Sequence, residues 1–242
     1  MPTITLLHTS DLHNTLRPAA AEQLAQLLRE AAPALLLDSG DAVRAGNLAF
    51  SPRGEPVLQR MAEVGYAAMA MGNRESHPSL VALRQKLKDA TFPVLSANLV
   101  VKRGRLPAAV QPSVLLEVGG TKVAVFGLTV PITRPGSAWA AVTDIVFEDP
   151  LTTARRLAPE LRPQADLVVC LSHCGFRLDA QLAEIGEIDL VLGGHSHRLF
   201  IEQTPGQAMV VHPGHHGSHV SRTEIAGRDR VASELIPLRT EP

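Results

Sequence analysis

Short apolar runs alternate along the chain with segments in which apolar residues recur at helical spacing. The run at residues 3–9 predicts a strand, and residues 19–31 predict an amphipathic helix with Leu24, Leu27 and Leu28 on one face. The same alternation continues toward the C-terminus. The further predicted strands are residues 34–37, 66–71, 93–96, 166–171 and 188–192, and the further predicted helices are residues 55–64, 77–89, 150–161 and 178–185.

Two regions depart from this alternation. Residues 113–118 and 121–128 are strand-like runs on either side of Gly119 and Gly120, which is the signature of a β-hairpin. Residues 200–238 contain strand-like runs separated by glycine and proline. Repeated β-α units with added hairpins predict an α/β fold, with a mixed sheet or two packed sheets covered by helices.

The composition adds limits on the number of domains and on the partners. The chain has 242 residues, 45% of them hydrophobic, and no Ser/Gly-rich or charge-run linker, so we expect a single domain over residues 1–242. The formal net charge of -1 gives no electrostatic footprint for a nucleic acid polymer or an anionic membrane. No apolar run reaches the length of a membrane span and the first residues lack a secretory signal, so we expect a cytoplasmic protein. Cys170 and Cys174 are expected to be reduced thiols.

Asp, Asn or His stands at the end of five of the predicted strands. Because ligand-binding groups in open α/β sheets gather at the carboxyl ends of strands, we expect these side chains to meet. In three of the five places a glycine is adjacent, which allows a tight turn and a close approach of phosphate to the backbone. The residues are Asp11 and His13 after the first strand, Asp41 after the second, Asn73 after the third, His173 after residues 166–171, and His195 and His197 after residues 188–192.

These residue types predict a metal site. Carboxylates, an amide oxygen and imidazoles form a ligand field of oxygen and nitrogen without thiolate, which suits Mn, Fe, Zn or Ni. The pairs Asp11-x-His13 and His195-x-His197 each let two side chains of one short turn reach the same ion. A carboxylate that bridges two ions holds them roughly 4 Å apart, the spacing used in phosphoester hydrolysis. Any one of these fragments alone is more often a capped turn or a solvated loop, but five of them at strand ends favour a metal site.

The same segments resemble the motifs of the calcineurin-like metallophosphoesterase superfamily. The similarity covers nearly the whole chain and is greatest to the catalytic, N-terminal domain of the 5′-nucleotidase branch. The motifs that carry it are residues 7–13 (LHTSDLH), 38–41 (DSGD), 70–75 (AMGNRE), 92–98 (FPVLSAN), 171–175 (LSHCG) and 193–197 (GGHSH). The resemblance implies a four-layer αββα sandwich with two packed, mostly mixed β-sheets.

The resemblance also implies a dinuclear metal centre and its chemistry. The two implied ligand sets are Asp11, His13, Asp41 and His197 for one ion, and Asp41, Asn73, His173 and His195 for the other, with Asp41 as the bridge. The two divalent ions are expected to be Mn, Fe, Zn, Ni or Mg, with Mn favoured. A metal-bound water or hydroxide would attack phosphorus in line. The implied activity is hydrolysis of small phosphate esters, with nucleotides favoured, and monoesters and diesters stay open as alternatives.

Position 74 departs from the family pattern, which usually has histidine there to stabilise the transition state and assist the leaving group. Arg74 places a fixed positive charge on phosphate oxygens but cannot give up a proton near neutral pH. His77, where the 5′-nucleotidase pattern has Asp, is either a substitute acid or a helix-start histidine without a catalytic part. We expect catalysis by Asp41, Arg74 and His77, and substrate contacts from Asn73, Arg74 and His195. The alternative is a metal-holding sensor or scaffold domain that binds a nucleotide or phosphate with little turnover.

The resemblance covers only the catalytic half of the 5′-nucleotidase pattern. We expect no nucleotide-clamping C-terminal domain, because the chain ends at Pro242, and a separate substrate-binding partner or a homo-oligomer is an alternative source of the clamp. Aromatic residues are only 3% of the chain, and Trp139 is expected to be a partly buried packing residue rather than a stacking platform. The histidine-rich residues 212–219 are expected to include solvated loop histidines rather than further ligands.

Overall fold

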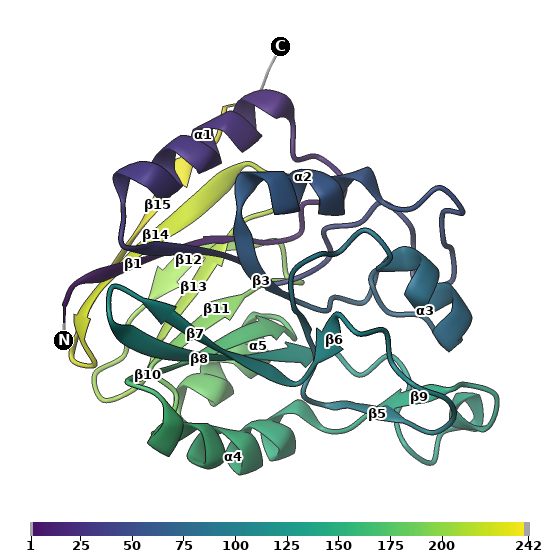
Figure 1. Ribbon diagram of the computed structural model, residues 1–242. Coiled ribbons are helices and arrows are strands. Elements are labelled where there is room, and N and C mark those ends of the chain that lie inside the picture. The colour runs from purple at the N-terminus through teal and green to yellow at the C-terminus, as the bar shows by residue number, and fades with distance from the viewer. Residues whose placement is uncertain (1, 240–242) are drawn as a thin grey trace.

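Strand β1 (Ile4–Thr9) is buried on both of its faces, and each face contacts a different part of the core. Ile4 and Leu6 pack into an apolar layer between two sheets, whereas Leu7 packs toward the helices that cover the first sheet. The computed structural model describes residues 2–239, and in it β1 lies inside a layered α/β fold (Figure 1).

The first sheet consists of β1 and six further strands. These are β2 (Ala34–Asp38), β3 (Tyr66–Ala70), β4 (Val94–Leu95), β6 (Val110–Gln111), β14 (His219–Gly227) and β15 (Arg230–Pro237). Their order is β15-β14-β1-β2-β3-β4-β6. Strands β1, β2, β3, β4 and β6 are parallel to one another, and β14 and β15 extend the sheet beside β1 as antiparallel strands.

The second sheet has six strands. These are β7 (Ser113–Val118), β8 (Thr121–Thr129), β10 (Leu167–His173), β11 (Leu190–Gly193), β12 (Leu199–Glu202) and β13 (Met209–Pro213), in the order β12-β13-β11-β10-β8-β7. The four central strands are parallel, and β7 and β12 are antiparallel edge strands. A separate antiparallel pair is formed by β5 (Leu99–Val101) and β9 (Ile145–Phe147).

Helices cover the outer face of each sheet (Figure 1). On the first sheet these are α1 (Pro18–Glu30), α2 (Pro56–Val64) and α3 (Leu80–Lys86), and on the second they are α4 (Pro150–Leu161) and α5 (Phe176–Ala183), with short 3₁₀ helices η1 (Ala138–Ala141) and η2 (Arg162–Gln164) in the connections. None of the helices within residues 2–239 combines the length and the apolar character needed to cross a membrane.

The alternation of side chains along the strands produces the four layers. In β10, Val169 and Leu171 face the first sheet, whereas Val168 and Cys170 face the helices on the other side. Strands with apolar residues on both faces are typical of sheets that are covered on both sides. The predicted αββα sandwich with two packed, mostly mixed sheets is therefore confirmed.

Two local predictions have different outcomes. The hairpin of β7 and β8 forms as expected, with Gly119 (φ 57°) and Gly120 (φ 76°) both left-handed at its turn. The helix expected at residues 77–89 is shorter at both ends, and at its start Pro78 disfavours a helical conformation at His77. The first amide of α3, that of Leu80, instead donates to the carboxylate of Asp144 at 2.9 Å.

The two sheets come into direct backbone contact near the ends of β4 and β8. A Cβ atom added to Gly127 would lie 2.2 Å from the carbonyl oxygen of Leu95, so only glycine fits there. The amide of Ala97 donates to the carbonyl of Gly127 at 2.7 Å, and the hydroxyl of Thr129 donates to the carbonyl of Met71 at 2.8 Å. These contacts bring the turns that follow β3 and β8 to the same edge of the molecule.

We predict that Gly127→Ala lowers the free energy of unfolding by about 1–3 kcal/mol, because the added methyl group forces the two sheets apart. The measurement is urea unfolding followed by circular dichroism. Gly186→Ala is the matched control, because a Cβ atom there meets no atom within 4 Å. Equal stability of the two variants would contradict the close approach of the sheets.

Candidate metal centre

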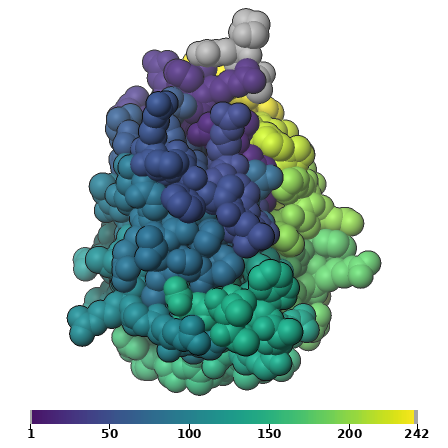
Figure 2. All heavy atoms as spheres, turned by 90° about the vertical axis from the view of Figure 1, so that its right-hand side faces the viewer, coloured from purple at the N-terminus to yellow at the C-terminus, as the bar shows by residue number. Residues whose placement is uncertain are grey.

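The seven predicted metal ligands lie at strand ends on one side of the molecule. Strand β1 runs from left to right in Figure 1, so its carboxyl end and those of its parallel neighbours β2 and β3 point to the right. Figure 2 shows this face, on which residues of the N-terminal third (indigo and blue) border on residues of the C-terminal third (green and yellow). The ligands therefore come from both ends of the sequence. They are Asp11, His13, Asp41, Asn73, His173, His195 and His197.

The backbone at these strand ends is strained. The non-glycine residues with positive φ among those described are Asp11 (50°), His13 (46°), Asn14 (64°), Asp41 (57°), His195 (68°), His197 (55°) and His216 (54°). Five of these seven are predicted ligands. A left-handed non-glycine residue costs on the order of 1–3 kcal/mol and persists only where its surroundings hold it, and such residues cluster at functional sites.

One group of ligand atoms is formed by Asp11, His13 and His197, whose atoms all lie within 4.8 Å of one another. Asp11 Oδ2 accepts the amide proton of His195 at 2.9 Å. Asp11 Oδ1 is buried without a hydrogen-bond partner among the described residues and lies 3.3 Å from His197 Nε2. His13 Nε2 lies 3.1 Å from His197 Nε2. A cation bound between these atoms would provide the missing partner of Asp11 Oδ1.

A second group is formed by Asp11, Asp41 and His173, again within 4.8 Å. His173 Nε2 lies 3.4 Å from Asp41 Oδ1 and 3.2 Å from Asn73 Oδ1. His173 Nδ1 lies 2.8 Å from the carbonyl oxygen of Ser39, which can only accept, so Nδ1 carries the proton and Nε2 is the ligand atom. The ring of His195 lies 5.0 Å from that of His173, centroid to centroid.

The amide of Asn73 is oriented by a neighbour that the sequence did not single out. Asn73 Nδ2 donates to Asn47 Oδ1 at 3.0 Å, which turns Asn73 Oδ1 toward His173. An amide oxygen, two carboxylates and four imidazoles, with one carboxylate oxygen left unpaired, fit a pair of divalent cations. Asp11 is the residue common to both compact groups, and the bridging role of Asp41 stays a prediction.

The electrostatics of the site keep Asp41 ionised. Burial raises the pKa of Asp41, but the nearby His173 and the amide of Arg74, which donates to Asp41 Oδ1 at 2.7 Å, together lower it to about 2. Burial lowers the pKa of His173, and the attraction of Asp41 more than offsets this and raises it. Burial and the charge of Arg74 lower the pKa of His13 to about 4. Ionised carboxylate and neutral imidazole are the forms that bind a cation, and the proton held by His173 would be released on binding.

Arg74 and His77 occupy different surroundings. Arg74 Nε lies 3.7 Å from Asp41 Oδ2, so its guanidinium stands beside the ligands, and its NH1 group donates to the carbonyl of Arg44 at 3.3 Å. His77 Nδ1 accepts the amide proton of Ser79 at 2.9 Å, and its ring meets that of Phe50 edge-on. Of the two, Arg74 is in contact with a predicted ligand, and the catalytic role of His77 stays a prediction.

A buried carboxylate outside the predicted set organises the turns. Glu75 is fully buried and accepts the amide protons of Asp41 at 2.8 Å, Gly72 at 2.9 Å and Val43 at 3.0 Å. It therefore joins the turn after β2 to the turn after β3. Burial and the charge of Asp41 raise the pKa of Glu75. The motif at residues 70–75 contains Glu75, but nothing in its spacing indicates this role.

A buried lysine closes the same region. Lys86 is fully buried at the end of α3, and its ammonium group donates to the carbonyl oxygens of Gly46 (2.8 Å), Ser76 (3.1 Å) and Arg74. Burial lowers its pKa to about 8. In the sequence Lys86 belongs to an amphipathic helix, where a lysine is expected on the solvated face, so the pattern gives no sign of its burial.

The histidine-rich segment agrees with expectation only in part, because His212 is buried on β13, and the tryptophan differs from expectation. The loop at Gly214–Gly217 is attached to the first ligand turn, because the amide of His216 donates to the carbonyl of Asp11 at 2.8 Å. His216 is exposed as expected, yet its ring lies 5.0 Å from that of His13. Trp139 is 67% exposed on η1, so the expected partly buried packing role is wrong. The 3₁₀ turn around it buries only Ala140.

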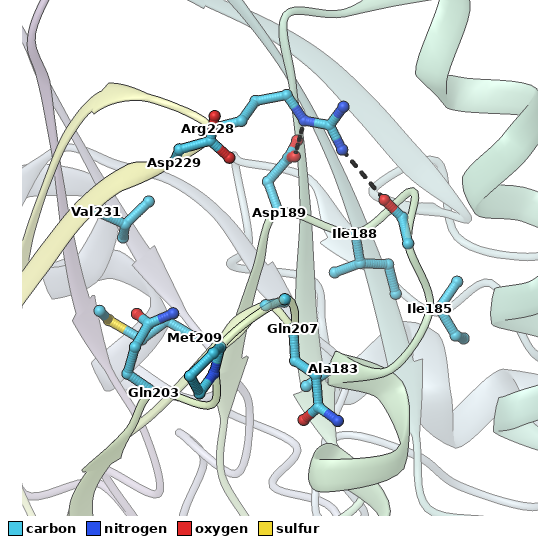
Figure 3. A pocket seen from close by; sticks show the side chains of 14 residues that line it. Ala183, Ile185, Ile188, Asp189, Gln203, Gln207, Met209, Arg228, Asp229 and Val231 are labelled. Atoms are coloured by element: carbon cyan, nitrogen blue, oxygen red, sulfur yellow. Dashed lines mark hydrogen bonds and ion pairs between the residues drawn. The ribbon is translucent and has the colours of Figure 1, made fainter.

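A cavity of about 640 Å³ lies away from these residues (Figure 3). It is lined by Asp189, which directly precedes β11, and by Arg228, whose Nε donates to Asp189 at 2.5 Å. The predicted ligands His195 and His197 follow the opposite, C-terminal end of β11. This cavity is therefore not the metal centre.

Comparisons with known proteins identify similar sequences. Residues 4–199 match the family described as calcineurin-like phosphoesterase. The trifunctional nucleotide phosphoesterase protein YfkN of Bacillus subtilis is 29% identical, with 92% of this chain and 18% of YfkN covered. The human 5′-nucleotidase is 30% identical, with 84% of this chain and 39% of that protein covered. The chain thus spans about two fifths or less of the length of these relatives.

Solved structures show the same fold. The 5′-nucleotidase precursor of Thermus thermophilus superposes with a TM-score of 0.83 at 27% identity, over 98% of this chain and 54% of that one. The NAD nucleotidase of Haemophilus influenzae superposes with a TM-score of 0.79 at 20% identity, over 98% of this chain and 50% of that one.

We predict a pH dependence of stability that arises from His8. This residue is fully buried, with Nε2 2.9 Å from the hydroxyl of Ser39, and burial lowers its pKa well below 6.5. As the pH falls below 6.5, the unfolded chain takes up a proton that the folded protein does not, so stability is lost. The slope attributable to His8 is up to about 1.4 kcal/mol per pH unit.

Urea unfolding of the wild type and of His8→Gln, both with a chelator present, measures this slope between about pH 7.5 and pH 5. The free energy of unfolding of the wild type is expected to fall more steeply with acidification than that of the variant. Parallel curves for the two proteins would show that His8 is protonated in the folded protein.

Proposed function

The chain belongs to the calcineurin-like phosphoesterase family, and we propose that it hydrolyses small phosphate esters, nucleotides first among them, with the help of two divalent cations. The observation that carries the proposal is the convergence of two carboxylates, one amide and four imidazoles from five strand ends on adjoining groups of ligand atoms. Nucleotides are favoured because YfkN is named a nucleotide phosphoesterase and the human relative a 5′-nucleotidase.

The ligand sets proposed for the two cations follow the positions of the family motifs. They are Asp11, His13, Asp41 and His197 for one ion, and Asp41, Asn73, His173 and His195 for the other. The ions proposed are Mn, Fe, Zn, Ni or Mg, with Mn²⁺ placed first; the carboxylate and amide oxygens suit Mn and Mg, and the imidazoles suit Zn, Fe and Ni. When bound, such a pair neutralises phosphate oxygens and activates water as a nucleophile.

The chain's own residues then bind and orient the ester. The guanidinium of Arg74, half-buried beside Asp41, is placed to donate to phosphate oxygens, and its charge does not depend on pH near neutrality. The carbonyl of Arg74 is held by Lys86, and its amide is held by Asp41. The backbone on both sides of the Arg74 side chain is therefore fixed. The guanidinium itself is oriented by its donation to the carbonyl of Arg44, which reduces the entropy lost on substrate binding.

The test is elemental analysis of the purified protein, together with hydrolysis of p-nitrophenyl phosphate and bis-p-nitrophenyl phosphate after addition of Mn²⁺. We expect about two metal ions per chain and turnover that a chelator abolishes. The preferred ester then distinguishes a monoesterase from a diesterase. Absence of bound metal after Mn²⁺ is supplied would overturn the proposal.

Asp41→Asn is expected to remove nearly all turnover and to lower the metal content, because the predicted bridge loses its charge. Asp229→Asn, which changes a carboxylate at the distant cavity, is the matched control and is expected to keep both. Full activity and metal content in Asp41→Asn would contradict the dinuclear assignment.

A second candidate function rests on Arg74 alone. Arginine at this position cannot donate a proton to a leaving group, and its guanidinium lies 3.7 Å from Asp41. A metal-holding domain that senses or binds a nucleotide or phosphate with little turnover would have this arrangement. A partner chain or a second copy that completes the substrate site is compatible with either function.

Arg74→His separates the two candidates. The enzyme proposal predicts that turnover falls, by about 10-fold, because a charge-assisted contact with phosphate is lost. The sensor alternative predicts a rise, of about 100-fold or more, because a general acid is supplied. Arg156→His, on the exposed face of α4, is the control for the loss of an arginine elsewhere.

A further inference from the structure

The turn His195-Ser196-His197 carries one predicted ligand for each of the two cations. Both histidines are left-handed, with φ of 68° and 55°, so the turn does not adopt this shape without external support. The backbone at the start of the turn is held on the ligand side, where the amide of His195 donates to Asp11 Oδ2 at 2.9 Å. The amide of Ser196 donates to the carbonyl of Gly194 at 2.8 Å, which is a contact within the turn itself.

The side chain of Ser196 contacts a buried histidine on the side of the turn away from the predicted ligand atoms. Ser196 Oγ lies 3.3 Å from His212 Nδ1, and His212 Nε2 lies 2.8 Å from Asp179 Oδ2. His212 stands on β13 and is 1% exposed, and Asp179 stands on α5 and is fully buried. The chain of contacts therefore runs from the helix layer, through the second sheet, to the ligand turn.

The direction of these hydrogen bonds follows from the chemistry of the groups. The ionised carboxylate of Asp179 can only accept, so His212 Nε2 donates to it. In the neutral imidazole the other ring nitrogen, Nδ1, has a lone pair and accepts from the hydroxyl of Ser196. The hydroxyl of Ser172 donates to the second oxygen of Asp179. The carboxylate thus has a donor on each oxygen, as a buried charge requires.

The imidazole of His212 is also fixed sterically. It stacks on the ring of Phe200 with centroids 4.7 Å apart and an interplanar angle of 17°. A Cβ atom on Gly193 would lie 2.1 Å from His212 Nε2 and 2.4 Å from Asp179 Oδ2, so the end of β11 passes directly over the pair. Any larger residue at position 193 would displace the pair and, with it, the support of Ser196.

We propose that Asp179, His212 and Ser196 form a positioning relay that sets the placement of His195 and His197 for two cations at once. The proposal rests on the proposed dinuclear function. None of the three residues supplies a predicted ligand atom, so they are positioning residues. Because Ser196 lies between the two histidines, loss of its anchor moves both ligands together, and the relay therefore couples the two cation sites.

The test is Ser196→Ala, studied by calorimetric titration of the chelator-treated protein with Mn²⁺, by thermal unfolding and by steady-state hydrolysis of p-nitrophenyl phosphate. We expect the affinity for Mn²⁺ to fall by about 10-fold or more, the range measured when groups that orient metal ligands are lost. Turnover at saturating Mn²⁺ is expected to recover most of the wild-type value. Ser196→Thr, which retains a hydroxyl, is expected to restore the affinity.

Ser221→Ala is the matched control. Ser221 Oγ lies 3.4 Å from Nδ1 of the buried His8, so this variant also removes a hydroxyl from a buried imidazole, but on β14 and not in the ligand turn. Both alanine variants are expected to lower the melting temperature by similar amounts, whereas only Ser196→Ala weakens Mn²⁺ binding.

The outcomes separate the relay from the proposed function. No Mn²⁺ binding by the wild type would refute the dinuclear function itself. Two bound ions with unchanged affinity in Ser196→Ala, or equal loss of affinity in Ser221→Ala, would refute the relay and leave the dinuclear function standing. Weaker binding in Ser196→Ala that Ser196→Thr does not restore would also refute it, because the hydroxyl would then not be the cause.

Discussion

Two buried carboxylates, those of Asp11 and Asp41, place an oxygen each within 4.8 Å of the other and of a ring nitrogen of His173. Like charges this close in a medium of low dielectric are unfavourable unless N–H donors and positive charge face them. The amides of His195 and Arg74 donate to these two carboxylates, and the guanidinium of Arg74 lies beside Asp41. The rest of the site supplies donors and positive charge to these two carboxylates. A pair of divalent cations would supply the largest positive charge in the smallest space.

The turns around Asp41 are constrained by the same need to accommodate and balance its buried charge. Gly72 has no side chain because a Cβ atom there would lie 2.3 Å from Asp41 Oδ1. Glu75 binds three amides of the two turns but adds a third buried negative charge close to Asp41. Lys86 brings a buried positive charge to the carbonyl groups on the same turns. Glu75 and Lys86 thus bring opposite charges to the same turns, and the charge of Glu75 favours the charged form of Lys86.

The parts of this arrangement that could be predicted are those with a local pattern. The strands are apolar runs, and Asp11, Asp41 and Asn73 lie two or three residues beyond their ends. Hydrophobic periodicity and the ends of strands were therefore enough to find the edge of the sheet. Glu75 and Lys86 were not found. Apart from Gly72, their partners lie 10 to 40 residues away in sequence, and only the packing of turns brings them together.

The relay of Asp179, His212 and Ser196 escaped prediction for the same reason. Asp179 and His212 are 33 residues apart, and each belongs to a different element. Trp139 was misjudged on a different ground, because hydrophobic size favours burial on average, whereas its short 3₁₀ helix lies at the surface. Hydrophobic periodicity thus identified the residues of each element that face the protein core, but it did not identify the polar contacts between elements.

Arg74 shows how one substitution changes the chemistry of such a site without changing its frame. Its amide and carbonyl are held by Asp41 and Lys86, contacts of the backbone that any residue except proline can make at position 74. The side chain is therefore free to vary, and arginine puts there a charge that does not titrate near neutral pH. Under the proposed function, the site can stabilise the charge that develops on phosphate oxygens, but the proton for a poor leaving group must come from elsewhere. Esters whose leaving group departs as an anion depend least on that proton, so they are the substrates that this arrangement disfavours least.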